Sequence, residues 1–221
     1  MTTFFITASG TDVGKTHVMT QLIAALGSHY RLRALKPIAT DFDAADPQNS
    51  DSARLLLAQN LPPTAENLDT VTPWRFAAPL SPDMAAKREQ RSIPFDELVD
   101  FCKLRTEAQI TLIEGIGGAM VPIDERHTVL DWISALDAIT LLVVGSYLGT
   151  LSHALTAAAA LQARRCRLGA VIVSESATQP VASEETAAVL RRFLRPLPVH
   201  VLPRVASPEP PNLNWLAVLN L

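Results

Sequence analysis

The feature that most constrains the fold is the loop after the first apolar segment. Residues 4–8 form a short β-prone run, and residues 18–26 carry apolar side chains at helical spacing. Between them the chain reads ASGTDVGKT, residues 8–16. Glycines allow backbone N–H groups to turn inward on a phosphate, the lysine neutralises its charge, and the threonine hydroxyl can ligate Mg²⁺. We therefore expect a phosphate-binding loop that opens a helix, although Ser9 stands where the pattern G-x-x-x-x-G-K-[ST] has glycine. An ordinary strand-to-helix turn is the alternative.

The rest of the chain continues this alternation of strand and helix. Further strands are predicted at residues 32–39, 109–114, 138–145, 168–173 and 199–202, and further helices at 51–58, 95–104, 129–136, 150–165 and 183–194. Short strands separated by helices indicate parallel crossovers. The prediction is a three-layer α/β fold of the P-loop NTPase type, with a mostly parallel sheet flanked by helices and one domain over residues 1–221. The proline-rich stretches 62–94 and 196–211 are predicted to be ordered loops.

Composition excludes several classes of partner. The net charge of −3, from 19 basic and 22 acidic residues, gives no electrostatic footprint for nucleic acid or an anionic membrane. The first residues do not read as a signal peptide, and no apolar run is long enough to span a membrane. Cys102 and Cys166 are far apart and lack metal-ligand spacing, so we expect two free thiols in a reducing compartment, the cytoplasm.

Ionisable residues follow the predicted strands. In a parallel sheet, ligands bind at the carboxyl ends of the strands. Lys36 ends the second strand, where Pro37 favours an extended conformation. It is either a surface lysine or a second cation for the phosphate. Glu114 ends an apolar strand before Gly115, Gly117 and Gly118, and a carboxylate buried there requires a metal or cationic partner. Asp51 either caps the helix at 51–58 or joins this site.

The loop after residues 138–145 offers a second anion site. Thr150 and Ser152 suit the cap of the following Ala-rich helix, and free N–H groups there could hold a carboxylate. Simple capping fits this segment equally well. His153 shows no partner and is interpreted as structural, and no Ser-His-Asp or Cys-His arrangement is visible.

These segments together resemble dethiobiotin synthetase, a ligase of biotin biosynthesis. The resemblance runs from Phe4 to about Leu202. Five blocks occur in the family's order: GTDVGKT at residues 10–16, KPIAT at 36–40, NSD at 49–51, EGIGG at 114–118 and LGTLSHA at 148–154. The segment APLSP at 78–82 is also similar to the family's substrate-side loop.

The resemblance implies a reaction between CO₂, 7,8-diaminopelargonate (7,8-diaminononanoate) and ATP. One amine and CO₂ give a carbamate, whose oxygen attacks the ATP γ-phosphate to form a carbamic–phosphoric anhydride. The second amine then closes the ureido ring and expels phosphate. Two anions must meet, which requires concentrated positive charge.

The resemblance also implies a role for each matching residue. Lys15 and Lys36 would supply positive charge, and Thr16, Asp51 and Glu114 would hold Mg²⁺. Thr11 and Thr40 would contact the diamine or carbamate, with Thr11 counted among the catalytic residues and Pro79 and Ser81 beside the substrate. Gly149, Thr150, Leu151 and Ser152 would bind the substrate carboxylate from the neighbouring subunit of a homodimer. The nucleotide would contact Asp12, Val13, Gly14, Lys15, Thr16, His17, Asp51, Glu114, Gly115, Ile116, Gly117, Ser174, Pro203, Arg204 and Val205.

The sequence departs from the family's pattern at two places, and three alternative functions stay open. Ala8-Ser9 replaces the usual start of the phosphate loop, and no asparagine follows residues 168–173 to read adenine, so another nucleoside triphosphate could serve. The rivals are a P-loop small-molecule kinase, for which Arg88 and Arg91 are the available lid, an amide-forming ligase, and a regulatory ATPase of the ParA/MinD type. The length excludes the glutamine-hydrolysing domain of amide-forming relatives, and the extra lysine of the regulatory ATPases is missing.

Overall fold

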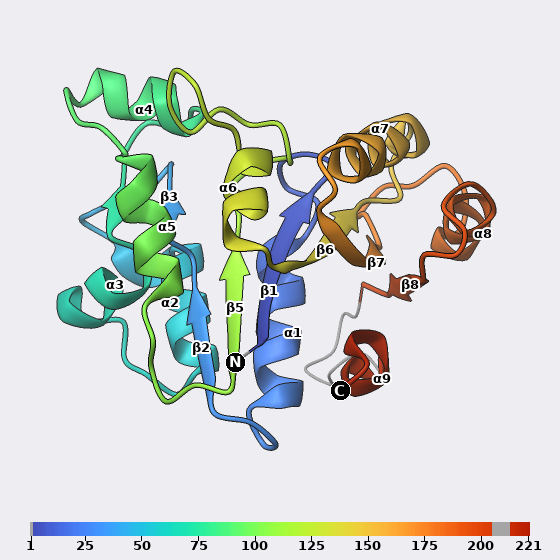
Figure 1. Cartoon of the computed structure of the whole chain (residues 1–221), viewed down its shortest axis with the longest axis horizontal. Helices are drawn as coiled ribbons and strands as arrows, with labels where there is room; N and C mark the ends of the chain where they lie inside the picture. Colours follow the sequence, from blue (N-terminus) through green and yellow to red (C-terminus); the bar gives the residue numbers. More distant parts are fainter. Residues whose placement is uncertain (1, 205–212) are drawn as a thin grey trace.

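A parallel six-stranded sheet forms the centre of the protein. The computed structural model describes residues 2–204 and 213–221. The strand order is β2-β5-β1-β6-β7-β8 and every neighbouring pair is parallel (Figure 1). The strands are β1 (Thr2–Ala8), β2 (Leu32–Leu35), β5 (Ile110–Glu114), β6 (Ile139–Val144), β7 (Arg167–Ser174) and β8 (Val199–Leu202). The prediction of a mostly parallel sheet flanked by helices is confirmed.

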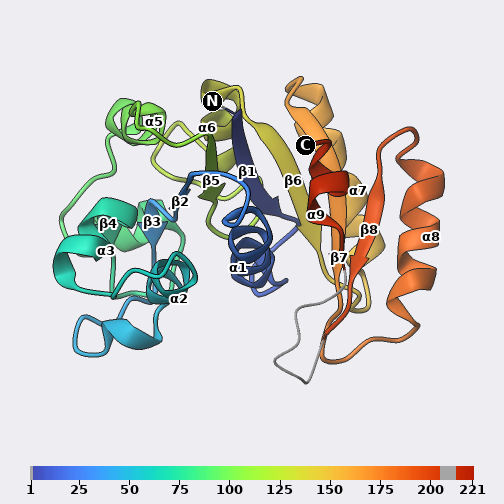
Figure 2. The ribbon, with the colours of Figure 1, turned by 90° about the horizontal axis from the view of Figure 1, so that it is seen from below.

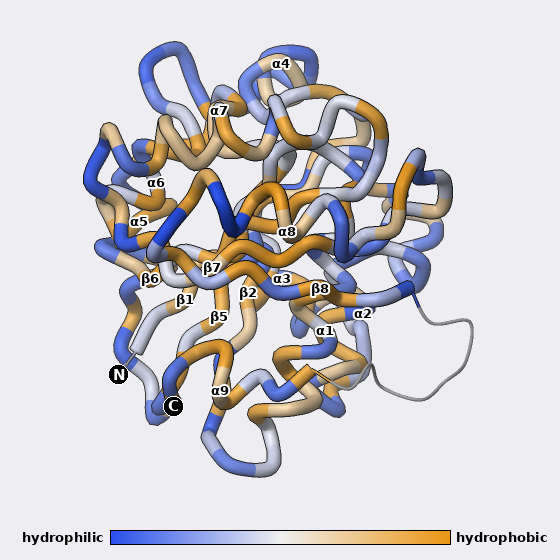
Figure 3. The backbone as a smooth tube through the Cα atoms, turned by 90° about the vertical axis from the view of Figure 1, so that its right-hand side faces the viewer, coloured by the Kyte–Doolittle hydropathy of each residue, from blue (hydrophilic) through white to orange (hydrophobic). Residues whose placement is uncertain are grey.

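Helices cover both faces of the sheet, because successive strand residues point to opposite sides. Phe4 and Ile6 of β1 pack with α1 (Lys15–Leu26) and α9 (Trp215–Leu219). Phe5 faces the other core, which contains α5 (Phe95–Lys103), α6 (Val129–Leu136), α7 (Thr150–Ala163) and α8 (Ser183–Phe193). Figure 2 shows these layers edge on, and Figure 3 shows that the hydrophobic strands lie inside and the hydrophilic loops outside. Both faces of the sheet are therefore sealed from water, so its strands carry the continuous apolar runs seen in the sequence.

Helix starts follow the expected capping chemistry. α2 (Asp51–Ala58) begins after Ser50, whose hydroxyl accepts from the Ala53 N–H at 3.1 Å. α6 begins with a capping box, in which Thr128 and Asp131 bond each other's backbone N–H. The predicted bounds of α2 and α6 match the structure.

Two parts of the prediction are wrong. The second strand does not run to residue 39: it ends at Leu35, and Ile38–Ala39 forms a separate strand, β3, paired with β4 (Trp74–Arg75). Pro37 between them has no N–H for the main sheet. Residues 62–94 are not only loops, because they contain α3 (Ala65–Val71) and α4 (Pro82–Arg88). Pro82 stands in the first turn of α4, where proline is tolerated. The sequence prediction also missed α9 and the short 3₁₀ helix Pro47–Asn49.

Two other expectations can be compared with the structure. Cys102 is buried, Cys166 is partly buried and both are free, as predicted. Among the described residues, no helix combines the length and apolar character needed to cross a membrane.

Candidate active site

The predicted phosphate loop lies between β1 and α1 as a turn that requires glycine. Gly14 precedes α1 with φ 96°, a left-handed conformation that L-residues rarely adopt. A Cβ on Gly14 would lie 2.5 Å from the Ser174 hydroxyl, so the end of β7 packs directly behind the loop. Lys15 and Thr16 then open the helix with their N–H groups at its positive end.

Strand register brings Lys36 and Glu114 together. Leu35 of β2 is paired with Ile113 of β5, so the residues that follow them lie level at the carboxyl edge of the sheet. The Lys36 Nζ is 2.5 Å from Glu114 Oε1, and both side chains are almost fully buried. Glu114 Oε1 also accepts a bond of 2.8 Å from the Thr16 hydroxyl. The end of β5, the residue after β2 and the first turn of α1 therefore converge on one carboxylate.

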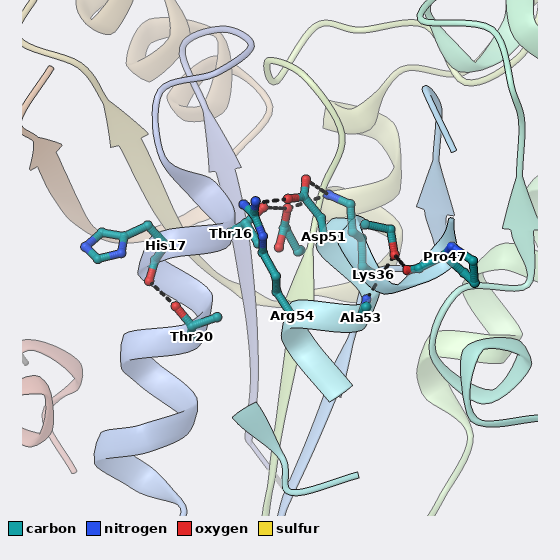
Figure 4. A network of polar contacts seen from close by, with 10 residues as sticks. Thr16, His17, Thr20, Lys36, Pro47, Asp51, Ala53 and Arg54 are labelled. Atoms are coloured by element: carbon teal, nitrogen blue, oxygen red, sulfur yellow. Dashed lines mark hydrogen bonds and ion pairs between the residues drawn. The ribbon is translucent and has the colours of Figure 1, made fainter. Parts of the chain in front are cut away.

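Asp51 completes this cluster from α2. Its Oδ2 is 3.5 Å from Lys36 Nζ, and its Oδ1 is 3.6 Å from Arg54 NH1 (Figure 4). The far end of α2 is fixed as well, because the Gln59 side chain bonds both the N–H and the carbonyl of Ala34 in β2. The helix that carries Asp51 is thus held on β2, the strand that leads directly into Lys36.

The two lysines have opposite electrostatic environments. Burial lowers the pKa of Lys15, and the more distant carboxylate of Glu114 offsets this only in part. For Lys36 burial also acts to lower the pKa, but Glu114 and Asp51 overcome it and the pKa is raised. No carboxylate within the described ranges lies at ion-pair distance from Lys15. Lys15 is therefore a buried ammonium that needs an anion, and Lys36 already has one.

The donor set fits a divalent cation. Glu114 Oε2 is buried and has no hydrogen-bond partner within residues 2–204 and 213–221. A carboxylate oxygen in that state is costly unless a cation reaches it. No group of three His, Cys, Asp or Glu side chains gathers for a metal in the described part. Mg²⁺ does not require one, because it is usually held by one or two carboxylates, water and substrate phosphates.

A cavity of about 970 Å³ opens onto these groups. Most of the predicted site residues line it: Thr11, Asp12, Gly14, Lys15, Thr16, His17, Lys36, Thr40, Asp51, Pro79, Ser81, Glu114, Ile116 and Gly117. The residues predicted to bind the phosphates and those predicted to bind the substrate thus line one cavity. The cavity also contains Arg54, Asp41 and Asn49, which the sequence interpretation did not assign.

Several predicted residues lie elsewhere. Val13 is buried in the core, and the Gly115 N–H bonds the Ile6 carbonyl. Ser174 lies behind the phosphate loop. Burial, and secondarily the charge of Arg204, lower the pKa of His17, which associates the loop after β8 with the start of α1. Pro203 and Arg204 end the described part of that loop, and Val205 lies outside the described residues.

Sequence reasoning also missed Glu175 in this region. Its carboxylate accepts from the Arg204 N–H at 2.9 Å and from the Gln179 amide at 2.7 Å. It ties the loop after β7 to the loop after β8, where the base of a nucleotide was expected. The pattern gave no signal for this role, because an exposed-looking Ser-Glu-Ser segment fits any loop.

The start of α7 does not line this cavity. The prediction that Thr150 caps the helix is wrong, because its hydroxyl donates to the Gly145 carbonyl at 2.7 Å. Gly149 precedes the helix with φ 96° and Ser152 lies inside it, so neither supplies a side-chain cap. His153 bonds the Tyr147 hydroxyl at 2.9 Å, in keeping with its interpretation as structural.

Comparison with known proteins decides the family. Residues 2–211 match the family model described as "AAA domain". The chain is 47% identical to the "ATP-dependent dethiobiotin synthetase BioD" of Acidiphilium cryptum, covering 98% of this chain and 97% of that protein. The chain belongs to the dethiobiotin synthetase family. The protein of the same name from Methylobacterium nodulans is 46% identical, over 87% of this chain and 89% of its own length.

Solved structures agree on the fold. The MinC:MinD complex of Aquifex aeolicus matches with a TM-score of 0.53 at 14% identity, over 93% of this chain and 82% of that one. A putative plasmid partition protein of Borrelia burgdorferi bound to AMPPNP also gives 0.53, at 8% identity, over 93% and 87%. At such identities the likeness shows the fold alone. The P-loop NTPase fold is thus confirmed for this dethiobiotin synthetase family member.

Proposed function

We propose that this chain is an ATP-dependent dethiobiotin synthetase, which joins CO₂ to 7,8-diaminononanoate and closes the ureido ring. The observation that carries the proposal is the convergence of Lys15, Lys36 and Thr16 with Glu114 in one cavity. Family membership indicates the reaction, and the cavity contains the clustered cations that this reaction requires. Its two reactants are both anions, and clustered cations lower the cost of bringing them together.

Different residues of the cavity have different roles in this reaction. Lys15, buried without an ion-pair partner among the described residues, meets the β- and γ-phosphates at the start of α1. Lys36 lines the same cavity, where its ammonium stabilises charge on the carbamate oxygen as that oxygen attacks the γ-phosphate. Thr16, Asp51 and Glu114 would hold Mg²⁺, which would neutralise phosphate charge. The second amine then attacks the carbamate carbon and phosphate leaves.

The diamine binds in the same cavity. Thr11 and Thr40 supply hydroxyls and Pro79 and Ser81 a partly apolar surface, and all four line the same space as the lysines. The nucleotide base lies toward His17, Ser174, Pro203 and Arg204. A side-chain amide is missing at the end of β7, so we expect weak discrimination among nucleoside triphosphates.

We further propose a homodimer in which the start of α7 completes the partner's site. Gly149 to Ser152 do not line the cavity of their own chain, so their predicted contact with the substrate carboxylate requires a second copy. Leu148 beside them is 85% exposed, so its apolar side chain is available for contact with a second copy. The free Cys102 and Cys166 support a cytoplasmic location.

Phosphate release tests the function. The purified chain with ATP and Mg²⁺ should release phosphate only when both 7,8-diaminononanoate and bicarbonate are present, with dethiobiotin appearing in equal amount by mass spectrometry. Repeating the assay with other triphosphates measures base selectivity. Phosphate release without the diamine would contradict the proposal.

Subunit mixing tests the shared site. A Lys15→Ala chain and a Gly149→Glu chain should each be inactive, and an equal mixture after subunit exchange should regain about a quarter of wild-type activity, because half the dimers hold one intact site. No recovery, together with a monomeric mass by light scattering, would contradict the dimer.

The kinase rival finds no support in the cavity. Arg91 bonds the Arg75 carbonyl and Glu89 and lies over Phe76, and neither Arg88 nor Arg91 is among the residues that line the described cavity.

A further inference from the structure

Arg54 is a third cation of the cavity, beside Lys15 and Lys36. It lies in the first turn of α2 and lines the cavity with Thr16 and Lys36. Its side chain is 64% exposed, so the guanidinium is free to move, unlike the two buried ammonium groups. Figure 4 shows it rising from α2 toward Asp51, on the side where Thr16 begins α1.

Arg54 is now paired with Asp51. The distance from its NH1 to Asp51 Oδ1 is 3.6 Å, while the other carboxylate oxygen is 3.5 Å from Lys36. Asp51 therefore has two cationic neighbours. Three lysine or arginine side chains line the cavity, facing the carboxylates of Asp12, Asp41, Asp51 and Glu114.

This balance changes when Mg²⁺ and a triphosphate enter. If the metal takes up the charge of Asp51 and Glu114, Arg54 loses its counter-ion, and the nucleotide brings an excess of negative charge to the same space. A guanidinium is always protonated, and its planar fork matches two phosphoryl oxygens, which a lysine ammonium cannot do. Arg54 is exposed and stands at the rim, so it can turn to the new anion without unpacking the core.

We propose that Arg54 leaves Asp51 when the metal binds and contacts the terminal phosphoryl group of the nucleotide. The inference deepens the proposed function and rests on its use of a nucleoside triphosphate. It assigns to α2 an added contact to the phosphate that is transferred, whereas the loop before α1 and Lys15 also bind the β-phosphate, which both ATP and ADP possess.

Equilibrium binding distinguishes a contact of Arg54 with the terminal phosphate from a mere surface ion pair of Arg54 with Asp51. The probes are Mg²⁺ complexes of the non-hydrolysable AMPPNP and of ADP, titrated calorimetrically into the wild-type chain and into Arg54→Ala. The variant should bind AMPPNP about tenfold to a hundredfold more weakly, the range expected for a hydrogen bond to a charged group, and ADP within about twofold of the wild type. Its Tm should move by less than about 2 °C, because an exposed i,i+3 pair contributes little.

Arg88→Ala is the matched control, because it removes the same charge from an exposed position on α4 that does not line the cavity. It should bind both nucleotides like the wild type. Arg54→Lys should fall between the wild type and Arg54→Ala for AMPPNP.

The inference is overturned by unchanged AMPPNP affinity in Arg54→Ala, by an equal loss for ADP, or by an equal loss in Arg88→Ala. Failure of the wild-type chain to bind either nucleotide would instead contradict the proposed function, so the two failures are distinguishable.

Discussion

Replacement of Lys36 by methionine should reduce stability as well as turnover. Methionine fills a similar volume but leaves the Glu114 carboxylate, which is 1% exposed, without its ammonium partner at 2.5 Å. Loss of one partner of a buried ion pair typically costs about 3–5 kcal/mol. Asp51 loses the same ammonium, but its side chain is 43% exposed and water replaces the contact.

Urea unfolding at pH 7.5 measures the effect. Lys36→Met should lose about 3–5 kcal/mol relative to the wild type. Lys36→Met combined with Glu114→Gln should recover most of it, since an amide needs no counter-ion, while dethiobiotin formation stays lower by orders of magnitude. A single variant within about 0.5 kcal/mol of the wild type at pH 7.5, or a double variant no more stable than the single, would refute the reasoning.

Three further predictions follow from other contacts. Lys15→Met should abolish turnover yet leave urea stability unchanged or higher, because burial lowers the pKa of Lys15 and no ion pair within the described residues is lost; a loss above about 2 kcal/mol would contradict this. Gly14→Ala should abolish nucleotide binding by calorimetry, and Ser174→Gly should not rescue it, because the φ of 96° still costs about 1–2 kcal/mol once the clash is relieved. Asp131→Ala should cost about 1 kcal/mol at pH 7 by loss of the α6 capping box. Although burial acts to raise the pKa of Asp131, bonds from Thr128 lower it, so this cost should disappear in urea melts as pH falls below 3.8; persistence there would count against it.

The fold was predictable where local and global signals agree. The apolar run at 4–8, the glycine turn and the helix after it are each specified by nearby residues, and the predicted bounds of α2 and α6 match because Ser50 and Thr128 are local caps. The break after Leu35 was not predictable in this way. An apolar run cannot reveal that its second half pairs with Trp74–Arg75 in another sheet, since that pairing depends on a distant segment.

The candidate site shows the same division. Lys15, Lys36 and Glu114 could be placed together from sequence, because parallel strands end at one edge of the sheet. Arg54 could not, because its direction depends on the rotation of α2 about its axis, which Gln59 and the packing of α2 set. Threonine is a common N-cap residue, but the Thr150 hydroxyl donates to the Gly145 carbonyl and does not cap the helix.

Transfer of oxygen is the most direct test of the central claim that clustered cations let a carbamate oxygen attack the terminal phosphate. A single turnover with freshly prepared ¹⁸O-labelled CO₂, the diamine, ATP and Mg²⁺, followed by mass spectrometry of the released phosphate, reports that bond. The account predicts that phosphate carries one labelled oxygen and that Lys36→Met forms neither labelled phosphate nor dethiobiotin. Unlabelled phosphate released together with dethiobiotin would contradict it.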